Sequence, residues 1–546
     1  MRGKRQKTQY SLALEPRDRG EAPVSGHPAA EPLVAKSAPE SPAWTEQLME
    51  TVCSRENLET AWKRVRSNKG GPGVDGMTID DAKGYLREHW PSIRSRLLEG
   101  TYQPQPVKRV EIPKPDGGVR KLGVPCVVDR LIQQALLQVL QEQWDPTFSE
   151  HSYGFRPGRS AHQAVAQAQC YIAEGYSYVV DLDLERFFDR VNHDSLMARV
   201  AARVSDKRVL KLIRAFLNAG VMEDGLVRPV DEGIPQGGPL SPLLSNLLLD
   251  DLDNQLTRRG HRFCRYADDC NIYIRSCRAG ERVMASVSRL LTTKLRLKVN
   301  EAKSAVARPE ERKFLGFSIA NDGSKRRIAP KALDKFKTLI RDMTRRTRGI
   351  SLPQLIKELK PYLIGWRGYF GFCQTPRVLT NLEAWIRRRL RLYLWRQWGN
   401  GHNRFKELRR CGVPKFGAAV AAGSPTGFWR MSGHPAVREG RRTRHFVLSL
   451  IERNQRPLTA QLLIRFVSSL EEELHSASEL DEIFCWPDLP SDSSAAKRNQ
   501  VRPTSGALLD FAMFFFHQGV GGAQHWDVLL SSEAGNQLAR CGTAPP

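Results

Sequence analysis

The sequence predicts an α+β fold in which an antiparallel sheet carries acidic side chains and a helical region follows it. In residues 262–274, two apolar runs flank Asp268 and Asp269, which predicts a β-hairpin with both carboxylates at its tip. Residues 178–184 alternate apolar and acidic side chains, a pattern typical of a strand. Residues 331–415 have the periodicity of amphipathic helices. A strand, an acidic hairpin and several helices therefore follow one another along the chain.

The hairpin tip is the first candidate site. Neighbouring side chains on a regular strand point to opposite faces, so Asp268 and Asp269 can approach one spot only where the chain turns. Carboxylates held close together repel unless a cation lies between them, and hard oxygen ligands favour Mg²⁺. An isolated Asp-Asp pair is more often a solvated turn, so a metal site requires further acidic residues nearby.

The upstream strand supplies such residues. Asp181 and Asp183 lie two positions apart and share one face of the predicted strand. In two-metal phosphoryl transfer, carboxylates from separate strands hold two Mg²⁺ ions, one activating the attacking hydroxyl and the other stabilising the leaving pyrophosphate. A strand aspartate and a hairpin Asp-Asp pair fit that arrangement.

From about Thr51 to about Pro435 the sequence resembles the reverse transcriptases, and most closely the group II intron reverse transcriptase/maturase family. Seven motifs occur in the family's order, which chance does not explain. They are Ile112-Pro-Lys-Pro-Asp-Gly-Gly-Val-Arg120, Ser152-Tyr-Gly-Phe-Arg-Pro-Gly-Arg-Ser160, Asp183-Leu-Glu-Arg-Phe-Phe-Asp189, Gly233-Ile-Pro-Gln-Gly-Gly-Pro-Leu-Ser-Pro242, Tyr266-Ala-Asp-Asp269, Asn300-Glu-Ala-Lys303 and Phe314-Leu-Gly-Phe317.

The resemblance implies a right-hand polymerase with α+β fingers and palm and an α-helical thumb, also called maturase domain X. It implies RNA-directed DNA synthesis, in which a primer 3′-hydroxyl attacks the α-phosphate of a dNTP held by two Mg²⁺ ions. Asp183 and Asp268 would be the main metal ligands and catalytic residues, with Asp269 as the third. Such a protein would also bind intron RNA for splicing and copy it into DNA at a target site.

Two cations flank a predicted turn early in the motif series. Lys114 and Arg120 lie on either side of Pro-Asp-Gly-Gly, which predicts a short ribbon with both charges near its tip. Without further context this is as easily a solvated basic hairpin. The resemblance places both residues on the triphosphate of the incoming nucleotide, whose charge they would neutralise.

Three further residues are nucleotide contacts by the resemblance. Phe188 would pack under the sugar and exclude a 2′-hydroxyl, with Phe187 in the core; the simpler alternative buries both rings in the core. Gln236 stands beside two glycines that allow close backbone approach, and its amide would contact nucleotide and template. Lys303 would lie near the active site, or it would face solvent.

The charge distribution indicates a nucleic-acid partner. The chain has a net charge of +25, and residues 331–415 contain 21 Lys and Arg against 5 Asp and Glu. Helices with arginine on the exposed face suit an A-form duplex or a structured RNA. From this region we predict RNA contacts by Arg387, Arg388, Arg391 and Arg396. The predicted partners are intron RNA, a template RNA with its DNA primer, target DNA and dNTPs.

The cysteines predict what the chain lacks and where it works. The ten cysteines form no Cys-x-x-Cys pair and no Cys/His cluster, so no zinc finger or HNH endonuclease module is expected. The chain therefore resembles the endonuclease-lacking branch of the family. Dispersed thiols fit a reducing bacterial cytoplasm, and no apolar run is as long as a membrane span.

The predicted domains are a disordered leader over residues 1–45, the fingers and palm with their N-terminal extension over 46–327, the helical thumb over 328–435, and an unassigned segment over 436–546. In this last segment the resemblance stops and the basic excess disappears. A frameshift, a gene fusion or an extra domain would each account for it.

Two other functions are compatible with the sequence. The chain could be an RNA-binding splicing factor that makes little use of its polymerase, although intact Asp183, Asp268 and Asp269 argue against complete loss. It could also be a domesticated reverse transcriptase in phage defence, with residues 436–546 as effector or regulator. A gene within intron RNA would favour the mobile element, and a stand-alone gene would favour domestication.

Overall fold

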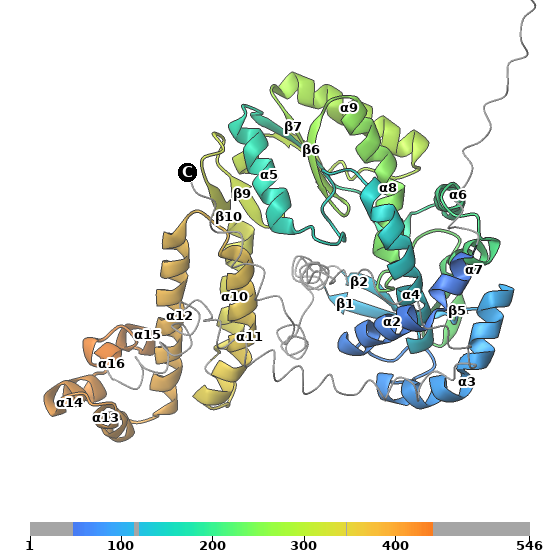
Figure 1. The fold of residues 1–546 in the computed structure, drawn as a ribbon. Coiled ribbons are helices and arrows are strands. Elements are labelled where there is room, and N and C mark those ends of the chain that lie inside the picture. The colour runs from blue at the N-terminus through green and yellow to red at the C-terminus, as the bar shows by residue number, and fades with distance from the viewer. Residues whose placement is uncertain (1–46, 114–118, 346, 440–546) are drawn as a thin grey trace, which may run out of the picture. The chain divides into compact units, whose positions relative to one another are not determined.

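The computed structural model describes residues 47–113, 119–345 and 347–439 (Figure 1). The N-terminal part is helical, with a hairpin inserted before the last helix. Its longest helix begins at a capping box, in which Thr78 and Asp81 each bond the other's backbone N–H, and ends at Gly100 in the left-handed region. The elements are α1 (Leu48–Val52), α2 (Arg55–Ser67), α3 (Ile79–Glu99), β1 (Val107–Pro113), β2 (Val119–Val124) and α4 (Val127–Trp144).

A first sheet has the strand order β2-β1-β4-β5. β4 (Val221–Glu223) and β5 (Leu226–Arg228) form a short hairpin, and β4 runs parallel to β1. The β1–β2 hairpin is the ribbon that the sequence predicts, since Pro113 pairs with Val119. The predicted triphosphate contact Lys114 and the side chain of Arg120 fall outside the described residues.

The second sheet is antiparallel, with the order β6-β7-β3-β8. It contains the predicted hairpin as β6 and β7, and the predicted acidic strand as β3. Val180 and Val179 point to opposite faces of the sheet. Val180 packs in the hydrophobic core that contains α9, and Val179 packs in the core that contains α5 (Figure 1). Its elements are α5 (Ala161–Ala173), β3 (Tyr178–Leu182), β6 (Arg262–Tyr266), β7 (Asp269–Ile274), α9 (Cys277–Lys294) and β8 (Ala305–Ala307).

Between β3 and β6 the chain forms a short 3-10 helix and three α-helices, and the β4–β5 hairpin of the first sheet comes between the last two of these helices in the sequence. The sequence predicts a helix over 243–252 capped by Ser241, but the helix begins two residues earlier and Ser241 is its first residue. The Ser241 hydroxyl instead donates to the carbonyl of Pro235 at 2.7 Å, which holds the preceding loop against the helix. The elements are η3 (Phe187–Asp189), α6 (His193–Ala201), α7 (Lys207–Asn218) and α8 (Ser241–Arg258).

After β8 a two-stranded ribbon leads into the helices that the periodicity predicts. No helix among the described residues is long and apolar enough to span a membrane. Two short 3-10 helices occur earlier in the chain, η2 (Asp145–Thr147) and η4 (Pro309–Glu311). The remaining elements are β9 (Phe317–Ile319), β10 (Arg326–Ile328), α10 (Pro330–Met343), α11 (Leu352–Phe370), α12 (Pro376–Gln397), α13 (Gly401–Arg410), α14 (Lys415–Gly423), α15 (Phe428–Met431) and α16 (Pro435–Glu439).

One hydrophobic core joins the second sheet to the first helices after it. Phe317 of β9 packs against Tyr369 and Phe370 of α11, with ring centroids 5.4 Å apart in both pairs. His162 of α5 lies against the same cluster, and its Nε2 is 2.9 Å from the carbonyl oxygen of Tyr369. This core therefore runs across the boundary predicted at residue 327, and the domain boundaries themselves stay a prediction. The predicted end segments fall almost wholly outside the described residues.

Candidate active site

The hairpin between β6 and β7 has a two-residue turn. Tyr266 pairs with Asp269, so Ala267 and Asp268 make the turn, and Ala267 has a φ of +57°. A positive φ in such a turn matches the twist of the flanking strands. The turn places Asp268 at the tip of the hairpin and Asp269 at the first position of β7.

β3 brings a second pair of carboxylates to the same edge of the sheet. Leu182 of β3 pairs with Cys270 of β7, and Asp183 is the next residue after β3. The backbone of Asp183 is held from the other side, because its carbonyl accepts from the N–H of Asn300 at 2.8 Å and its N–H donates to the hydroxyl of Ser304 at 3.0 Å. Asp183 therefore lies beside the first residue of β7, and these hydrogen bonds fix the position of its backbone.

The four carboxylates interact with one another. Burial, followed by the charges of Asp268, Asp181 and Asp183, raises the pKa of Asp269 to about 8. The structure therefore brings together the three acidic residues that the sequence predicts, with Asp181 as a fourth. Lys303 also lies here, with its Nζ 3.9 Å from Oδ2 of Asp183.

These side chains suit a divalent cation by their chemistry. All are carboxylates, which are the hard oxygen donors that Mg²⁺ prefers, and their mutual repulsion would be relieved by positive charge between them. In the part of the chain that the structure describes, no three acidic, His or Cys side chains meet closely enough to hold an ion as they stand. That Asp183, Asp268 and Asp269 hold a cation stays a prediction.

A buried arginine supports the hairpin from below. Arg265 of β6 is fully buried, and its guanidinium donates to both carboxylate oxygens of Asp253, at 2.8 and 2.6 Å. The same guanidinium donates to Oδ1 of Asn246, to the hydroxyl of Ser152 and to the carbonyl oxygen of Ala267 in the turn. The acidic turn is therefore tied to α8 and to residues 152–160 through one side chain. The sequence interpretation missed it, although a charged residue between apolar residues of the strand was the signal.

Gly154 lies close against the backbone of the turn. A Cβ at this position would lie 2.3 Å from the backbone nitrogen of Ala267 and 3.0 Å from the carbonyl carbon of Tyr266. Its carbonyl oxygen also accepts from Nδ2 of Asn246 at 2.8 Å. Only glycine fits between the loop and the hairpin as they stand.

We expect Gly154→Ala to lower the rate of primer extension about tenfold or more, because the methyl group must displace the backbone of the catalytic turn, and displacements near 1 Å have such effects. Steady-state extension on an RNA template measures this. Gly84→Ala is the matched control, since a Cβ at Gly84 on α3 meets nothing within 4 Å. Equal rates for the two variants would contradict the assigned contact.

Two other predicted nucleotide contacts, Phe188 and Gln236, lie on η3 and on a loop that is hydrogen-bonded to it. Phe188 is buried together with Phe187, as the simpler alternative expects. Its carbonyl oxygen accepts from the N–H of Ile234 at 2.7 Å, so the loop that carries Gln236 rests on η3. The side-chain oxygen of Gln236 is buried, and within the described residues it has no hydrogen-bond partner. A buried polar atom of this kind is costly unless a ligand satisfies it.

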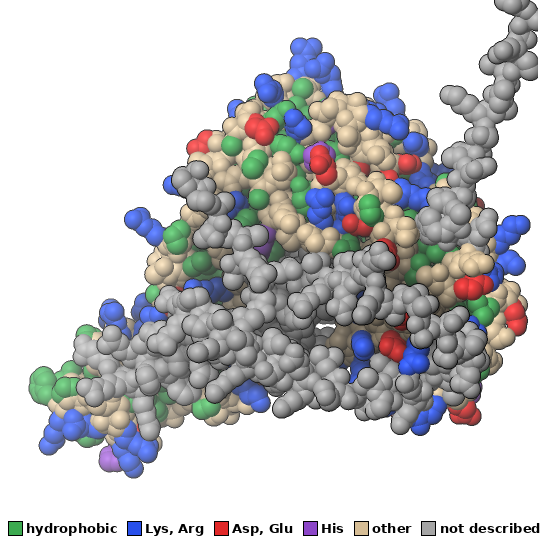
Figure 2. Space-filling view, in the orientation of Figure 1, with side chains coloured by type: hydrophobic (Ala, Val, Ile, Leu, Met, Phe, Trp, Pro, Cys, Tyr) green, Lys and Arg blue, Asp and Glu red, His purple; other side chains and the backbone are tan. Residues whose placement is uncertain are grey.

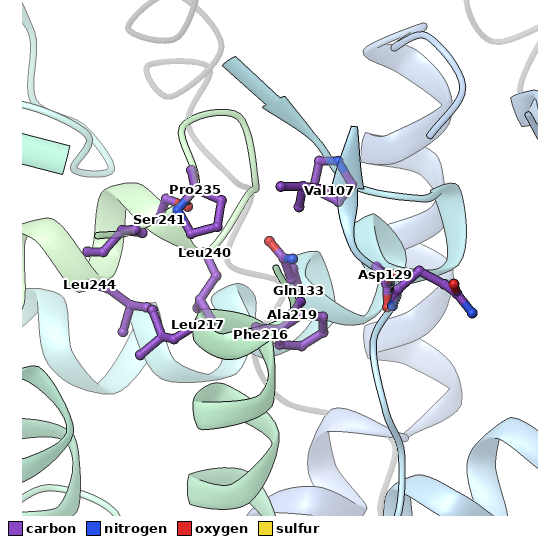
Figure 3. Close-up of a pocket in the computed structure, with 13 residues that line it drawn as sticks. Val107, Asp129, Gln133, Phe216, Leu217, Ala219, Pro235, Leu240, Ser241 and Leu244 are labelled. Atoms are coloured by element: carbon purple, nitrogen blue, oxygen red, sulfur yellow. Dashed lines mark hydrogen bonds between the residues drawn. The ribbon is translucent and has the colours of Figure 1, made fainter. Parts of the chain in front are cut away.

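Beside this loop lies a small cavity between α4, α7 and α8. Figure 3 shows Gln133 of α4 pointing toward the segment that carries Pro235, with Asp129 farther along the same helix. The cavity volume is about 20 Å³, enough for a water molecule and too small for a nucleotide. Asp129 is buried, and its two carboxylate oxygens accept from the Tyr102 hydroxyl at 2.9 Å and the Gln105 N–H at 3.0 Å.

Asp129 gives the fold a pH dependence. Burial raises the pKa of Asp129 to about 7, although both hydrogen bonds oppose the rise. The neutral form is therefore favoured in the folded state, and the stability it contributes is lost as the pH rises from about 4 to about 7. At about 1.4 kcal/mol per unit, this loss is a few kcal/mol.

We expect Asp129→Asn to flatten that part of the stability curve. Chemical denaturation of both forms at pH 4 to 8 measures it: the unfolding free energy of the wild type should fall relative to the variant as the pH rises. Tyr102→Phe removes a hydrogen bond that lowers this pKa, so it should move the transition to higher pH. Parallel curves for all three forms would rule out this role.

The four arginines predicted to bind RNA lie on α12 and are mostly engaged within the protein. Arg388 stacks over Trp429, 4.0 Å from the ring centre, and Nε of Arg391 donates to the carbonyl of Ser432 at 2.8 Å. Arg387 pairs with Glu383, and Arg396 is exposed above Phe428. Two of the four, Arg388 and Arg391, therefore hold the segment at 429–432, and Arg387 pairs within its own helix, which the helical pattern alone did not indicate. Their contact with RNA stays a prediction.

Positive charge is nevertheless crowded in this region. Burial, followed by the charges of Arg438, Arg387 and Arg388, lowers the pKa of Arg391 to about 10. On the face drawn in Figure 2, Lys and Arg side chains also lie over the outer helices α13 and α14. Crowded cations of this kind are stabilised by a polyanion.

Comparison with known proteins identifies two domains. Residues 112–319 match the family described as reverse transcriptase (RNA-dependent DNA polymerase), and residues 333–412 match the maturase-specific domain of group II introns. The first match spans the second sheet, the first sheet except for most of β1, and all four carboxylates. The second match spans α11 to α13 and most of α10.

Two curated relatives and one solved structure show the extent of the similarity. Protein YkfC of Escherichia coli is 33% identical over 301 residues, which are 48% of this chain and 79% of that protein. The group II intron-encoded protein LtrA of Lactococcus lactis is 36% identical over 206 residues, 38% of this chain and 34% of LtrA. A partial Cas6-RT-Cas1–Cas2 complex is similar with 24% identity and a TM-score of 0.31, over 45% of this chain and 43% of that chain.

The chain thus spans most of YkfC but about a third of LtrA. The two matched domains follow one another in the order that the motifs predict, and the carboxylates of the first domain meet at one edge of its sheet. The protein belongs to the group II intron-encoded reverse transcriptase/maturase family, with an RNA-directed DNA polymerase domain followed by a maturase-specific domain.

Proposed function

We propose that this protein extends a DNA primer on an RNA template at the edge of the second sheet, using two Mg²⁺ ions held by Asp183, Asp268 and Asp269. The observation that carries the proposal is the meeting of these carboxylates from β3 and from the β6–β7 turn. When bound, the ions would activate the primer 3′-hydroxyl and neutralise the leaving pyrophosphate.

The protein's own groups orient the reactants in this proposal. The unpaired side-chain oxygen of Gln236 accepts a hydrogen bond from the nucleotide or the template base, which relieves its buried, unsatisfied state. Phe188, held beneath that loop, packs against the sugar and selects deoxynucleotides. Lys114, Arg120 and Lys303 supply positive charge to the triphosphate.

The maturase-specific domain is proposed to bind the intron RNA for splicing. The basic excess over residues 331–415 and the crowded arginines of α12 support this, because a phosphate backbone would relieve their repulsion. Binding to the folded RNA would stabilise its active form, and the same RNA would then be copied into DNA at a target site. Such mobility is the proposed role of the whole protein.

Primer extension on an RNA template with Mg²⁺ and dNTPs tests the first part. The full chain should synthesise DNA, and Asp183→Asn should not, while both bind structured RNA equally in a filter assay. If the wild-type chain binds RNA and never extends the primer, the polymerase proposal fails and a splicing factor without polymerase use is the better description. Replacing dNTPs with NTPs tests the selection assigned to Phe188.

A further inference from the structure

A fourth carboxylate stands next to the three proposed metal ligands. Asp181 precedes Asp183 by two residues on the same face of β3, and it pairs across the sheet with Asn271, two residues after Asp269. A residue in this position is the diagonal neighbour of Asp269, at a spacing of about 7–8 Å in antiparallel sheets. Its side chain is 22% exposed, and its charge contributes to raising the pKa of Asp269.

One arginine is dedicated to this carboxylate. Nε and Nη2 of Arg312 both donate to Oδ2 of Asp181, at 2.9 and 2.6 Å. Nη2 also donates to the backbone carbonyl of Lys303 at 2.5 Å. The guanidinium therefore joins β3 to the turn of residues 300–303, which holds the backbone of Asp183 through Asn300.

The charges make this pairing significant. Without Arg312, the edge would hold one more unpaired carboxylate, and Asp181 would be available to a cation. An arginine that grips one oxygen with two donors competes strongly for that carboxylate. The pair thus separates Asp181 electrically from the residues on either side of it.

We propose that Arg312 is a positioning residue of the polymerase site: it neutralises Asp181 and orients the residue 300–303 turn, so that a divalent cation is held by Asp183, Asp268 and Asp269 and not shared with Asp181. This inference rests on the proposed function. It is distinct from a purely structural salt bridge, which would hold the fold together without affecting the charge seen by the metal.

The sign of the change in metal affinity separates the two roles. Arg312→Gln leaves an extra negative charge and should bind a divalent cation more tightly, yet extend primers more slowly because Asp181 draws the ion away. Asp181→Asn leaves an unpaired guanidinium and should weaken metal binding. A unit charge at this distance changes divalent affinity by about threefold to tenfold. The double variant restores the net charge and should return to within about twofold of wild type.

The experiment titrates Mn²⁺ into the full chain without nucleic acid or nucleotide and follows free Mn²⁺ by electron paramagnetic resonance. The forms are wild type, the two single variants, the double variant, and Arg312→Lys, which keeps the charge and should bind Mn²⁺ like wild type. Arg308→Gln is the control, since Arg308 stacks on Tyr178 nearby and should leave Mn²⁺ affinity unchanged. The Mg²⁺ dependence of primer extension is measured on the same samples.

Opposite shifts in the single variants, cancelled in the double variant, support the proposal. Weaker Mn²⁺ binding in both single variants, with no recovery in the double, would show a structural clamp and overturn it. Loss of all Mn²⁺ binding in Asp181→Asn would make Asp181 a ligand and also overturn it. If the single variants show opposite shifts in Mn²⁺ affinity but the wild-type chain never extends a primer, Arg312 is still a charge-balancing residue. The polymerase proposal is then rejected.

Discussion

Replacing Asp268 with asparagine is expected to reduce DNA synthesis by about a thousandfold or more while leaving RNA binding unchanged. The amide has the shape of the carboxylate but lacks its charge, so the proposed metal site loses a ligand at the point where charge develops. The hairpin should keep its geometry, because Arg265, Gly154 and strand pairing hold it. Single-turnover primer extension and a filter-binding assay on the same preparation measure the two properties.

Asp224→Asn is the matched control for this variant. Asp224 also stands in a two-residue hairpin turn, between β4 and β5, but it is exposed and lies outside the carboxylate cluster. We expect wild-type synthesis from it. Synthesis by Asp268→Asn at more than a tenth of the wild-type rate would refute the role of Asp268, and a joint loss of RNA binding would point to misfolding.

Removing the buried arginine beneath the hairpin should have the largest effect on stability. Arg265→Met keeps a similar volume but leaves Asp253 as an uncompensated charge with no exposed surface, at a cost of about 3–5 kcal/mol. The turn also loses the donor to the Ala267 carbonyl, so the catalytic residues lose their support. Urea denaturation measures the first effect and primer extension the second.

A second substitution separates these two effects. In Arg265→Met with Asp253→Leu the buried charge is gone, and replacing such a pair with apolar side chains is often neutral for stability. We therefore expect the double variant to regain much of the unfolding free energy while its primer extension stays low. Recovery of both properties together would mean that Arg265 stabilises the fold and does not position the turn.

The chemistry of the site could be predicted from the chain because it depends on local patterns. An alternating strand ending in Asp183, and a turn between apolar runs at Asp268 and Asp269, are short-range signals that strand geometry converts into one acidic edge. The structure places β3, β6 and β7 where these patterns predict them. The helices after residue 330 likewise follow from periodicity.

Tertiary structure alone decided which polar residues support this edge and which are available to ligands. Arg265 and Arg312 find their acidic partners 12 and 131 residues away along the chain, so no local pattern identifies the pairs. Arg388 and Arg391 lie in a basic helix that predicts a solvated face, yet they pack against Trp429 and Ser432. Periodicity reports which face of a helix is apolar, but burial of charge depends on a partner that only the folded chain brings into contact.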